Sequence, residues 1–220
     1  MAIDLPGHGD CEIDQKTVTM DDYVSAVCRT IDTVEHEQPI LVGHSMGGLV
    51  VSQVAERYPN RLAGLSYICA YLPQSGESLM SIEARNPAPR LTGAIVPAPD
   101  MTVAHINAEL AAPVFYSDCV ESDLRNSAAK LADQPGAPFL TPVSLSEEAF
   151  GTVPKQYLLC EKDQTIPAGL QEDMLSKRGD VDVVRLDSGH SPFLSKVDEL
   201  AASLIDFAAV LTAKGRRAAA

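Results

Sequence analysis

The chain has 220 residues, of which 45% are hydrophobic and 21% are charged. The length favours one domain, and these fractions are those of a globular protein, which excludes a disordered chain, collagen and a coiled coil. With 17 Lys and Arg against 30 Asp and Glu, the formal net charge is -13, which disfavours nucleic acid as a partner.

Targeting and redox signals are weak. No stretch approaches 18 apolar residues, so we expect neither a membrane-spanning helix nor a membrane partner. The N-terminal sequence MAIDLPGHGD has no basic region and carries acids early, so we expect no signal peptide and a cytoplasmic protein. The odd number of cysteines, their wide spacing and the lack of a CxxC pair predict reduced thiols and no metal site (Cys11, Cys28, Cys69, Cys119 and Cys160). Cys69 and Cys160 lie in apolar runs and are expected in the core.

Five short apolar runs predict buried strands, at residues 1–5, 39–43, 62–70, 155–160 and 182–186. Helical patterns fall between them. An apolar stripe starting at Met20 predicts a helix, with Thr19 and Asp22 as a capping box, and a second stripe covers residues 197–211. This alternation predicts an α/β fold with a mostly parallel sheet and helices on both faces.

Residues 72–152 interrupt this alternation. The segment is rich in Pro and Gly, with weak helical patches at 103–110 and 122–132. A structureless loop of that length is implausible within a compact domain. We therefore expect a core made of residues 1–71 and 153–220, and an inserted helical cap at 72–152.

The strongest local motif is a G-x-S-x-G pattern at Gly43, Ser45 and Gly47. The apolar run ILV precedes it and the helical run LVVSQVAERY follows it, which is the strand–turn–helix setting of a nucleophile elbow. In such a turn the serine hydroxyl stands at the C-terminal edge of the sheet. The backbone N–H of Met46, at the start of the following helix, would face a developing oxyanion.

A serine nucleophile needs a general base, and His190 is the best candidate among five histidines. It follows the strand predicted at 182–186, so it lies on the same sheet edge as Ser45. His44 adjoins Ser45, but neighbouring side chains on an elbow diverge. His8 is expected to be structural, and His36 and His105 to be solvated or capping residues.

Three carboxylates could orient the base. Asp187 is close to His190 in sequence, and Glu161 is also available. We favour Asp163, because it follows a different strand and can approach the imidazole from the side. It also produces the chain order nucleophile, acid, base that is typical of this motif.

Together, DLPGHG at 4–9, GHSMGG at 43–48, the Asp163 turn and GHSPF at 189–193 resemble the α/β-hydrolase superfamily. More closely, the chain is similar to bacterial esterases related to the methyl salicylate esterase, polyneuridine aldehyde esterase and hydroxynitrile lyase group. The likeness covers almost the whole chain. It implies a fold with an inserted cap and Ser45, Asp163 and His190 as the triad.

Two departures from this pattern affect the expectation. Related hydroxynitrile lyases carry a lysine shortly after the catalytic histidine, whereas Ser191 follows His190 here. Ester hydrolysis is therefore favoured over lyase activity. The resemblance also implies that the chain begins within the fourth strand, so that strands 1–3 and one oxyanion donor are absent. Losing one such donor would cost about 10²–10³ in rate.

The sequence thus predicts a serine carboxylic-ester hydrolase that needs no cofactor. Its substrate is expected to be a small or medium apolar ester, with aryl, lactone and pyrethroid-type esters left open. Candidate pocket residues are His44, Tyr71, Phe115, Tyr116 and Phe193. The alternatives are a lyase or C–C hydrolase on the same triad and a catalytically silent binding protein. The sequence leaves homo-oligomerisation open.

Overall fold

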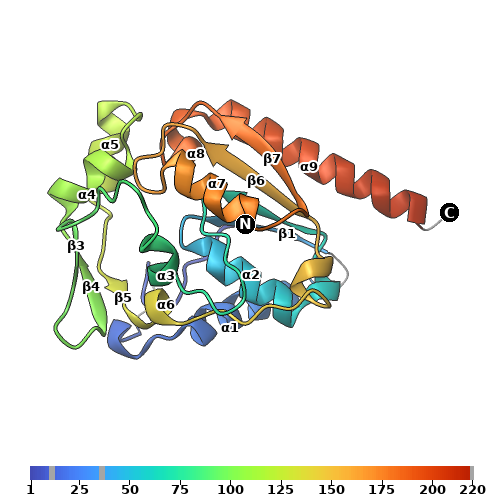
Figure 1. Ribbon diagram of the computed structural model, residues 1–220, viewed down its shortest axis with the longest axis horizontal. Coiled ribbons are helices and arrows are strands. Elements are labelled where there is room, and N and C mark those ends of the chain that lie inside the picture. Colours follow the sequence, from blue (N-terminus) through green and yellow to red (C-terminus); the bar gives the residue numbers. More distant parts are fainter. Residues whose placement is uncertain (10–12, 35–37, 219–220) are drawn as a thin grey trace.

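The computed structural model describes residues 1–9, 13–34 and 38–218, and its centre is a four-stranded parallel sheet (Figure 1). The strand order is β1-β2-β6-β7. The strands are β1 (Ile40–His44), β2 (Gly64–Ile68), β6 (Lys155–Cys160) and β7 (Val181–Leu186). Four of the five predicted strands are therefore confirmed. All four point the same way, so their C-terminal ends meet at one edge of the sheet.

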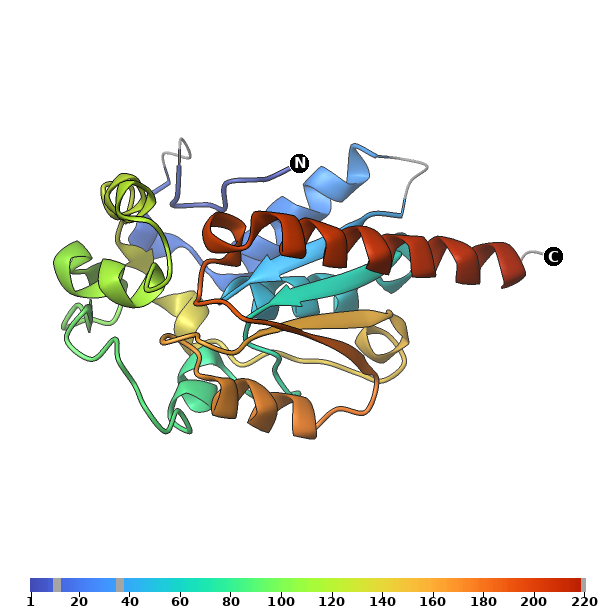
Figure 2. The same ribbon diagram turned by 90° about the horizontal axis from the view of Figure 1, so that it is seen from above.

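Helices cover both faces of this sheet, as the apolar patterns predict. On one face α1 (Met20–Asp32), α2 (Gly47–Arg57) and α7 (Ala168–Ser176) enclose the main hydrophobic core. On the other face lies the long helix α9 (Val197–Ala218), and Figures 1 and 2 show it running across the sheet. No helix of the described residues is long and apolar enough to cross a membrane.

Because the strands are pleated, the side chains of one strand contribute to two hydrophobic cores, one on each face of the sheet. In β6, Tyr157 and Leu159 belong to the main core, whereas Leu158 and Cys160 pack with Leu200 of α9. Successive side chains of a strand point to opposite faces, so both faces of a central strand must be apolar. This is why the second half of β6, YLLC at 157–160, is apolar without alternation. Cys69 and Cys160 are fully buried, as expected.

Helix α1 begins where the sequence predicts. Thr19 accepts a hydrogen bond from the backbone N–H of Asp22, and the Asp22 carboxylate accepts one from the backbone N–H of Thr19. This reciprocal capping box satisfies donors that the first helical turn leaves free. The buried face of α1 includes Tyr23, Val24 and Ile31.

The first predicted strand, at residues 1–5, is wrong. The residues form no ladder with any described strand, and the first four are exposed. A β-strand exists only through hydrogen bonds to a neighbour, and an apolar run alone does not supply one. The chain then turns at residues 6–9, where the N–H of His8 donates to the carbonyl of Leu5.

The inserted segment is mixed rather than purely helical. It contains α3 (Leu79–Glu83), α4 (Ala108–Phe115), α5 (Glu121–Ala128), α6 (Ala137–Leu140) and an antiparallel sheet of β3 (Ile95–Pro97), β4 (Val103–Ile106) and β5 (Gln134–Pro135). The helix expected at 103–110 is wrong in its first half, because residues 103–106 pair with β3 on one side and β5 on the other. Pairing with distant strands overrides a weak local preference. The patch at 122–132 forms α5, which ends at Ala128.

The remaining elements are short. Three 3₁₀ helices and one helical turn complete the order: η1 (Gln15–Thr17), η2 (Pro59–Arg61), η3 (Phe150–Thr152) and α8 (Pro192–Ser195). The inserted segment extends from the end of the main sheet at which the strands terminate (Figures 1 and 2). It therefore lies over the edge to which Ser45, Asp163 and His190 belong.

Candidate active site

Ser45 occupies a tight turn between β1 and α2. Its φ of 53° lies in the left-handed region, which a non-glycine residue adopts only at a cost. The turn needs glycines beside it, because a Cβ on Gly43 would lie 2.8 Å from the carbonyl oxygen of Gly47. A Cβ on Gly48 would lie only 2.1 Å from the carbonyl oxygen of Tyr71. The motif thus folds as a strained elbow with close backbone contacts on both sides.

The chain leaving β2 holds this elbow in place. The N–H of Ser45 donates to the carbonyl of Ile68 over 3.3 Å, and the N–H of Tyr71 donates to the carbonyl of Ser45 over 3.0 Å. The N–H of Met46 makes no hydrogen bond within the described chain, and it stands at the N-terminus of α2. That free donor, helped by the helix dipole, suits a developing oxyanion.

His190 and Asp163 form a buried pair at the same sheet edge. Nδ1 of His190 lies 2.8 Å from Oδ2 of Asp163, and their side chains are 2% and 0% exposed. The other Asp163 oxygen accepts hydrogen bonds from the backbone N–H groups of Thr165 and Ile166, at 2.7 and 3.0 Å. The carboxylate is therefore fixed, and it holds the imidazole with Nδ1 protonated and Nε2 free to act as base.

The alternative carboxylates lie elsewhere. Asp187 pairs with Lys162 at 2.8 Å, and Glu161 pairs with Arg185 at 3.4 Å, both in exposed positions. Of the three candidates, only Asp163 contacts the base within the described structure.

No hydrogen bond joins Ser45 to His190 in the described chain, and Ser45 lines the cavity whereas His190 lies behind Phe115, which does line it. The imidazole rings of His44 and His190 are 4.5 Å apart, so the residue next to Ser45 is in contact with the base. Catalytic hydrogen bonds are often long before substrate binds, and they tighten in the complex.

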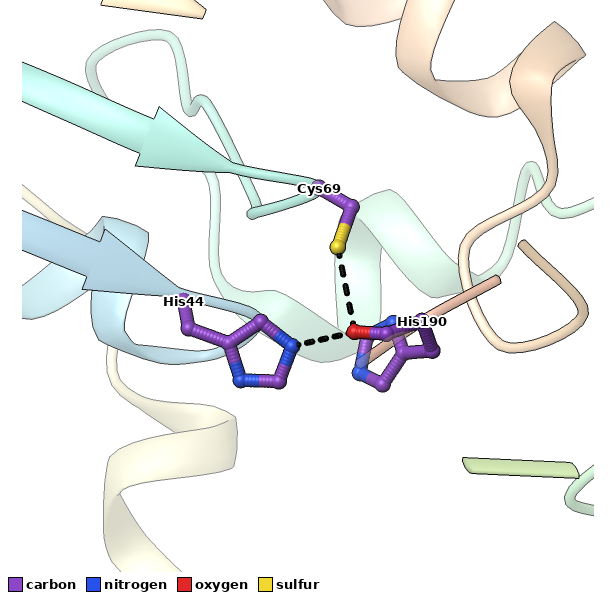
Figure 3. Close-up of side chains that lie close together, drawn as sticks. All are labelled: His44, Cys69 and His190. Atoms are coloured by element: carbon purple, nitrogen blue, oxygen red, sulfur yellow. Dashed lines mark hydrogen bonds between the residues drawn. The ribbon is translucent and has the colours of Figure 1, made fainter. Parts of the chain in front are cut away.

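Two further hydrogen bonds hold the backbone of His190. The backbone carbonyl oxygen of His190 accepts hydrogen bonds from Nε2 of His44, at 2.7 Å, and from Sγ of Cys69, at 3.3 Å (Figure 3). Burial, aided by nearby His190, lowers the pKa of His44 to about 3, so His44 stays neutral. Burial also raises the pKa of the Cys69 thiol, so it keeps its proton. Both groups therefore act as permanent donors that hold the His190 backbone.

The same three residues have the composition of a metal site. Their candidate ligand atoms all lie within 4.8 Å of one another. However, His44 and Cys69 direct those atoms at the His190 carbonyl, and Nδ1 of His190 is engaged by Asp163. A metal ion would have to displace these hydrogen bonds, so the geometry fits positioning of the base better than metal binding.

A cavity of about 440 Å³ opens beside the elbow. Ser45 and Met46 lie in its wall. Most other lining residues are apolar and come from the inserted segment, among them Leu79, Leu91, Ile95, Ile106, Leu131 and Phe139. A concave, mostly apolar space next to a nucleophile is the usual form of a small-molecule site.

The five predicted pocket residues divide into two groups. Tyr71 and Phe115 line the cavity, and the Phe115 ring lies 5.7 Å from that of His190. His44, Tyr116 and Phe193 are not among the lining residues. Phe193 is instead 42% exposed and packs edge-on against His44, and Tyr116 packs against Phe115.

Two of the other histidines, His8 and His105, have different partners outside this site. His8 is hydrogen-bonded to the hydroxyl of Tyr23 at 3.0 Å, and His105 pairs with exposed Asp133 at 2.7 Å. His36 lies outside the described residues.

Sequence reasoning missed Glu83 and Thr165, which line the cavity, and the role of Cys69. Thr165 follows Asp163 closely, so its nearness to the site could have been noticed. Glu83 carries no such signal, because only the folding of the inserted segment brings α3 to the sheet edge.

Comparison with known proteins supports this picture. The chain is 29% identical over 216 residues to the pyrethroid hydrolase of Sphingobium wenxiniae, covering 94% of this chain and 76% of that protein. A crystal structure of the pyrethroid hydrolase of Sphingobium faniae superposes with a TM-score of 0.84 at 27% identity, over 93% of this chain and 84% of that one.

Two Arabidopsis thaliana proteins are also similar to this chain, and their names describe them as methylesterases 11 and 15. They are 26% and 25% identical to this chain over 95% and 93% of its length. The chain spans only 56% and 49% of their length, about half. A model of the alpha/beta hydrolase family matches residues 1–203. The chain therefore belongs to the alpha/beta hydrolase family.

Proposed function

We propose that this protein is a serine carboxylic-ester hydrolase that works through an acyl-enzyme. The observation that supports this most is the buried 2.8 Å pair of His190 and Asp163 at the edge where the strained Ser45 elbow faces a cavity. Relatives that are hydrolases and esterases by name support the same class.

The proposed reaction has two half-reactions, and His190 acts first as base and then as acid in each. Ser45 Oγ attacks the ester carbonyl while Nε2 of His190 takes its proton, and the Met46 N–H stabilises the oxyanion. His190 then gives that proton to the departing alcohol. Water then attacks the acyl-enzyme while His190 takes its proton, the bond between Ser45 Oγ and the acyl carbon breaks, and His190 returns the proton to Ser45 Oγ as the acid leaves. Asp163 keeps the imidazole oriented and stabilises its charged form throughout.

The apolar wall of the cavity favours an ester with an apolar body. Its volume, about 440 Å³, suits a small or medium molecule. The names of the relatives make methyl esters and pyrethroid-type esters the first substrates to try.

The test is hydrolysis of p-nitrophenyl butyrate by the full chain and by Ser45→Ala. Ser195→Ala is the matched control, because Ser195 lies on α8 outside the cavity. We expect activity in the wild type and the control, and a loss of at least about 10³-fold in Ser45→Ala. Equal activity in all three proteins would refute the role of Ser45. Labelling of Ser45 by an organophosphate without ester turnover would instead favour carbon–carbon cleavage. The absence of labelling would favour a binding protein.

A further inference from the structure

The wall of the cavity has a polar corner formed by Tyr71, Glu83 and Thr165, and Thr92 and Gln134 are further polar residues of the lining. The three residues come from the loop after β2, from α3 and from the turn that carries Asp163. Most other lining residues are apolar, so this corner is where a polar group of a bound ester would be recognised.

Glu83 brings a negative charge to this corner. One carboxylate oxygen accepts a hydrogen bond from the Tyr71 hydroxyl and the other from the Asn86 amide, both at 2.8 Å. No Lys, Arg or His in the described part of the chain forms an ion pair with Glu83, and the neighbouring Arg85 is engaged by Glu77 and Asp173. A carboxylate facing an apolar cavity without a counter-charge is costly unless a ligand supplies one.

Tyr71 does not neutralise that charge. Burial, together with the Glu83 carboxylate, holds the pKa of the Tyr71 phenol well above its usual range. The phenol therefore donates a hydrogen bond but remains uncharged. Each Glu83 oxygen keeps a further lone pair for a ligand.

Thr165 is an independent sign of a missing partner. The residue is only 5% exposed and lines the cavity, yet its Oγ1 makes no hydrogen bond in the described structure. Its backbone N–H is held by Asp163, but Oγ1 itself is enclosed, so a ligand in the cavity reaches it only when the side chain rotates. A buried hydroxyl without a partner costs stability and is uncommon in native proteins.

We propose that this corner binds a protonated amine carried by the ester substrate. An ammonium group supplies the positive charge that Glu83 lacks and N–H donors for its carboxylate, and rotation of the Thr165 side chain would let the hydroxyl accept another. Resting on the proposed function, this inference narrows the substrate class from apolar esters to apolar esters that carry a basic nitrogen. The same corner disfavours esters that carry a second carboxylate.

The competing explanation is that Glu83 only ties α3 to the core. Asn86 also donates to the carbonyl of Thr165, so Glu83 belongs to a structural network as well. Glu83→Gln separates the two roles, because it keeps the size and one acceptor oxygen while removing the charge. Glu109→Gln is the matched control: Glu109 also lies in the inserted segment, but it is exposed and away from the cavity.

The experiment measures binding and does not depend on turnover. In a Ser45→Ala background, Kd is measured at pH 6.5 for two pairs of esters of matched shape. The first pair is 2-(dimethylamino)ethyl butyrate and 3-methylbutyl butyrate, with the nitrogen on the alcohol side. The second is methyl 4-(dimethylamino)butanoate and methyl 5-methylhexanoate, with the nitrogen on the acyl side.

We expect the amine of at least one pair to bind about 10- to 100-fold more tightly than its carbon analogue, the range for a hydrogen bond to a charged group. Glu83→Gln should abolish most of that preference, Thr165→Val part of it, and Glu109→Gln none of it. No preference in either pair, or a preference that survives Glu83→Gln, overturns the proposal. Turnover by the parent chain, measured separately, reports on the proposed function.

Discussion

Substitution of Gly48 by alanine tests the packing of the elbow most directly. The added Cβ would lie 2.1 Å from the Tyr71 carbonyl oxygen and 3.0 Å from the Cβ of Ala70, so backbone must move by roughly 1 Å. Overpacking of this kind costs about 3 kcal/mol, and alanine returns about 1 kcal/mol through its helix propensity. We expect a net loss of about 2 kcal/mol in the free energy of unfolding. In a chain of this size that lowers Tm by about 4–8 °C.

The neighbouring glycine provides the control. A Cβ on Gly47 would meet nothing within 4 Å, so Gly47→Ala should keep or slightly raise the stability. Both variants are compared by urea unfolding followed by circular dichroism. If Gly48→Ala unfolds at the same urea concentration as Gly47→Ala, the close contact with Tyr71 does not exist as described.

Three further predictions follow from the site and the fold. Asp163→Asn should lower kcat by about 10⁴-fold with a small change in KM, because the imidazole loses its orienting acceptor. Steady-state kinetics on p-nitrophenyl butyrate measures this change. A loss of kcat below 10-fold would contradict the role of Asp163. His44 has a pKa lowered to about 3, so between pH 6 and pH 4 it takes up a proton in the unfolded chain but not in the folded one. The free energy of unfolding should therefore fall with decreasing pH more steeply in the wild type than in His44→Gln, by about 1 kcal/mol per pH unit. Urea unfolding of both proteins between pH 6 and pH 4 measures this, and the same pH dependence in both would disprove it. Thr19→Ala removes the side-chain acceptor at the start of α1 and should cost about 1 kcal/mol, seen as a Tm lower by about 2–4 °C, whereas an unchanged Tm would show that the cap contributes nothing.

Much of the core architecture could be predicted, because it depends on local periodicity. The stretches ILV at 40–42 and YLLC at 157–160 are apolar without alternation, and in the structure both faces of the sheet are covered at β6. The capping pair Thr19 and Asp22 marks the start of α1 to the residue. These signals lie within about ten residues of the elements that they specify.

What could not be predicted depends on long-range pairing. Residues 1–5 have the composition of a strand, but no described strand pairs with them. Residues 103–106 look weakly helical and become a strand because β3 and β5 flank them. For the site, chain order was enough to favour Asp163 over Asp187, whereas the 2.8 Å contact of Asp163 with His190 and the pairing of Asp187 with Lys162 are seen only in the structure.

The same distinction applies to the cavity. Aromatic residues near the triad were reasonable candidates, and Tyr71 and Phe115 do line it. Phe193 follows His190 closely in sequence, yet its ring packs on His44 and is partly exposed. Adjacency to a catalytic residue in sequence is therefore weak evidence for contact with substrate.

Two separate segments of the chain fix the conformation of Ser45, and this limits how the elbow could be moved into another protein. Ser45 is held through its own N–H and carbonyl by residues 68 and 71, and Gly48 leaves room for the carbonyl of Tyr71. The conformation of the nucleophile is thus encoded by two stretches of chain about 20 residues apart. Moving GHSMGG alone into another strand–helix junction would transfer the sequence motif without the backbone contacts that fix its conformation. A graft of the elbow into an unrelated fold therefore has to include both segments, 43–48 and 68–71.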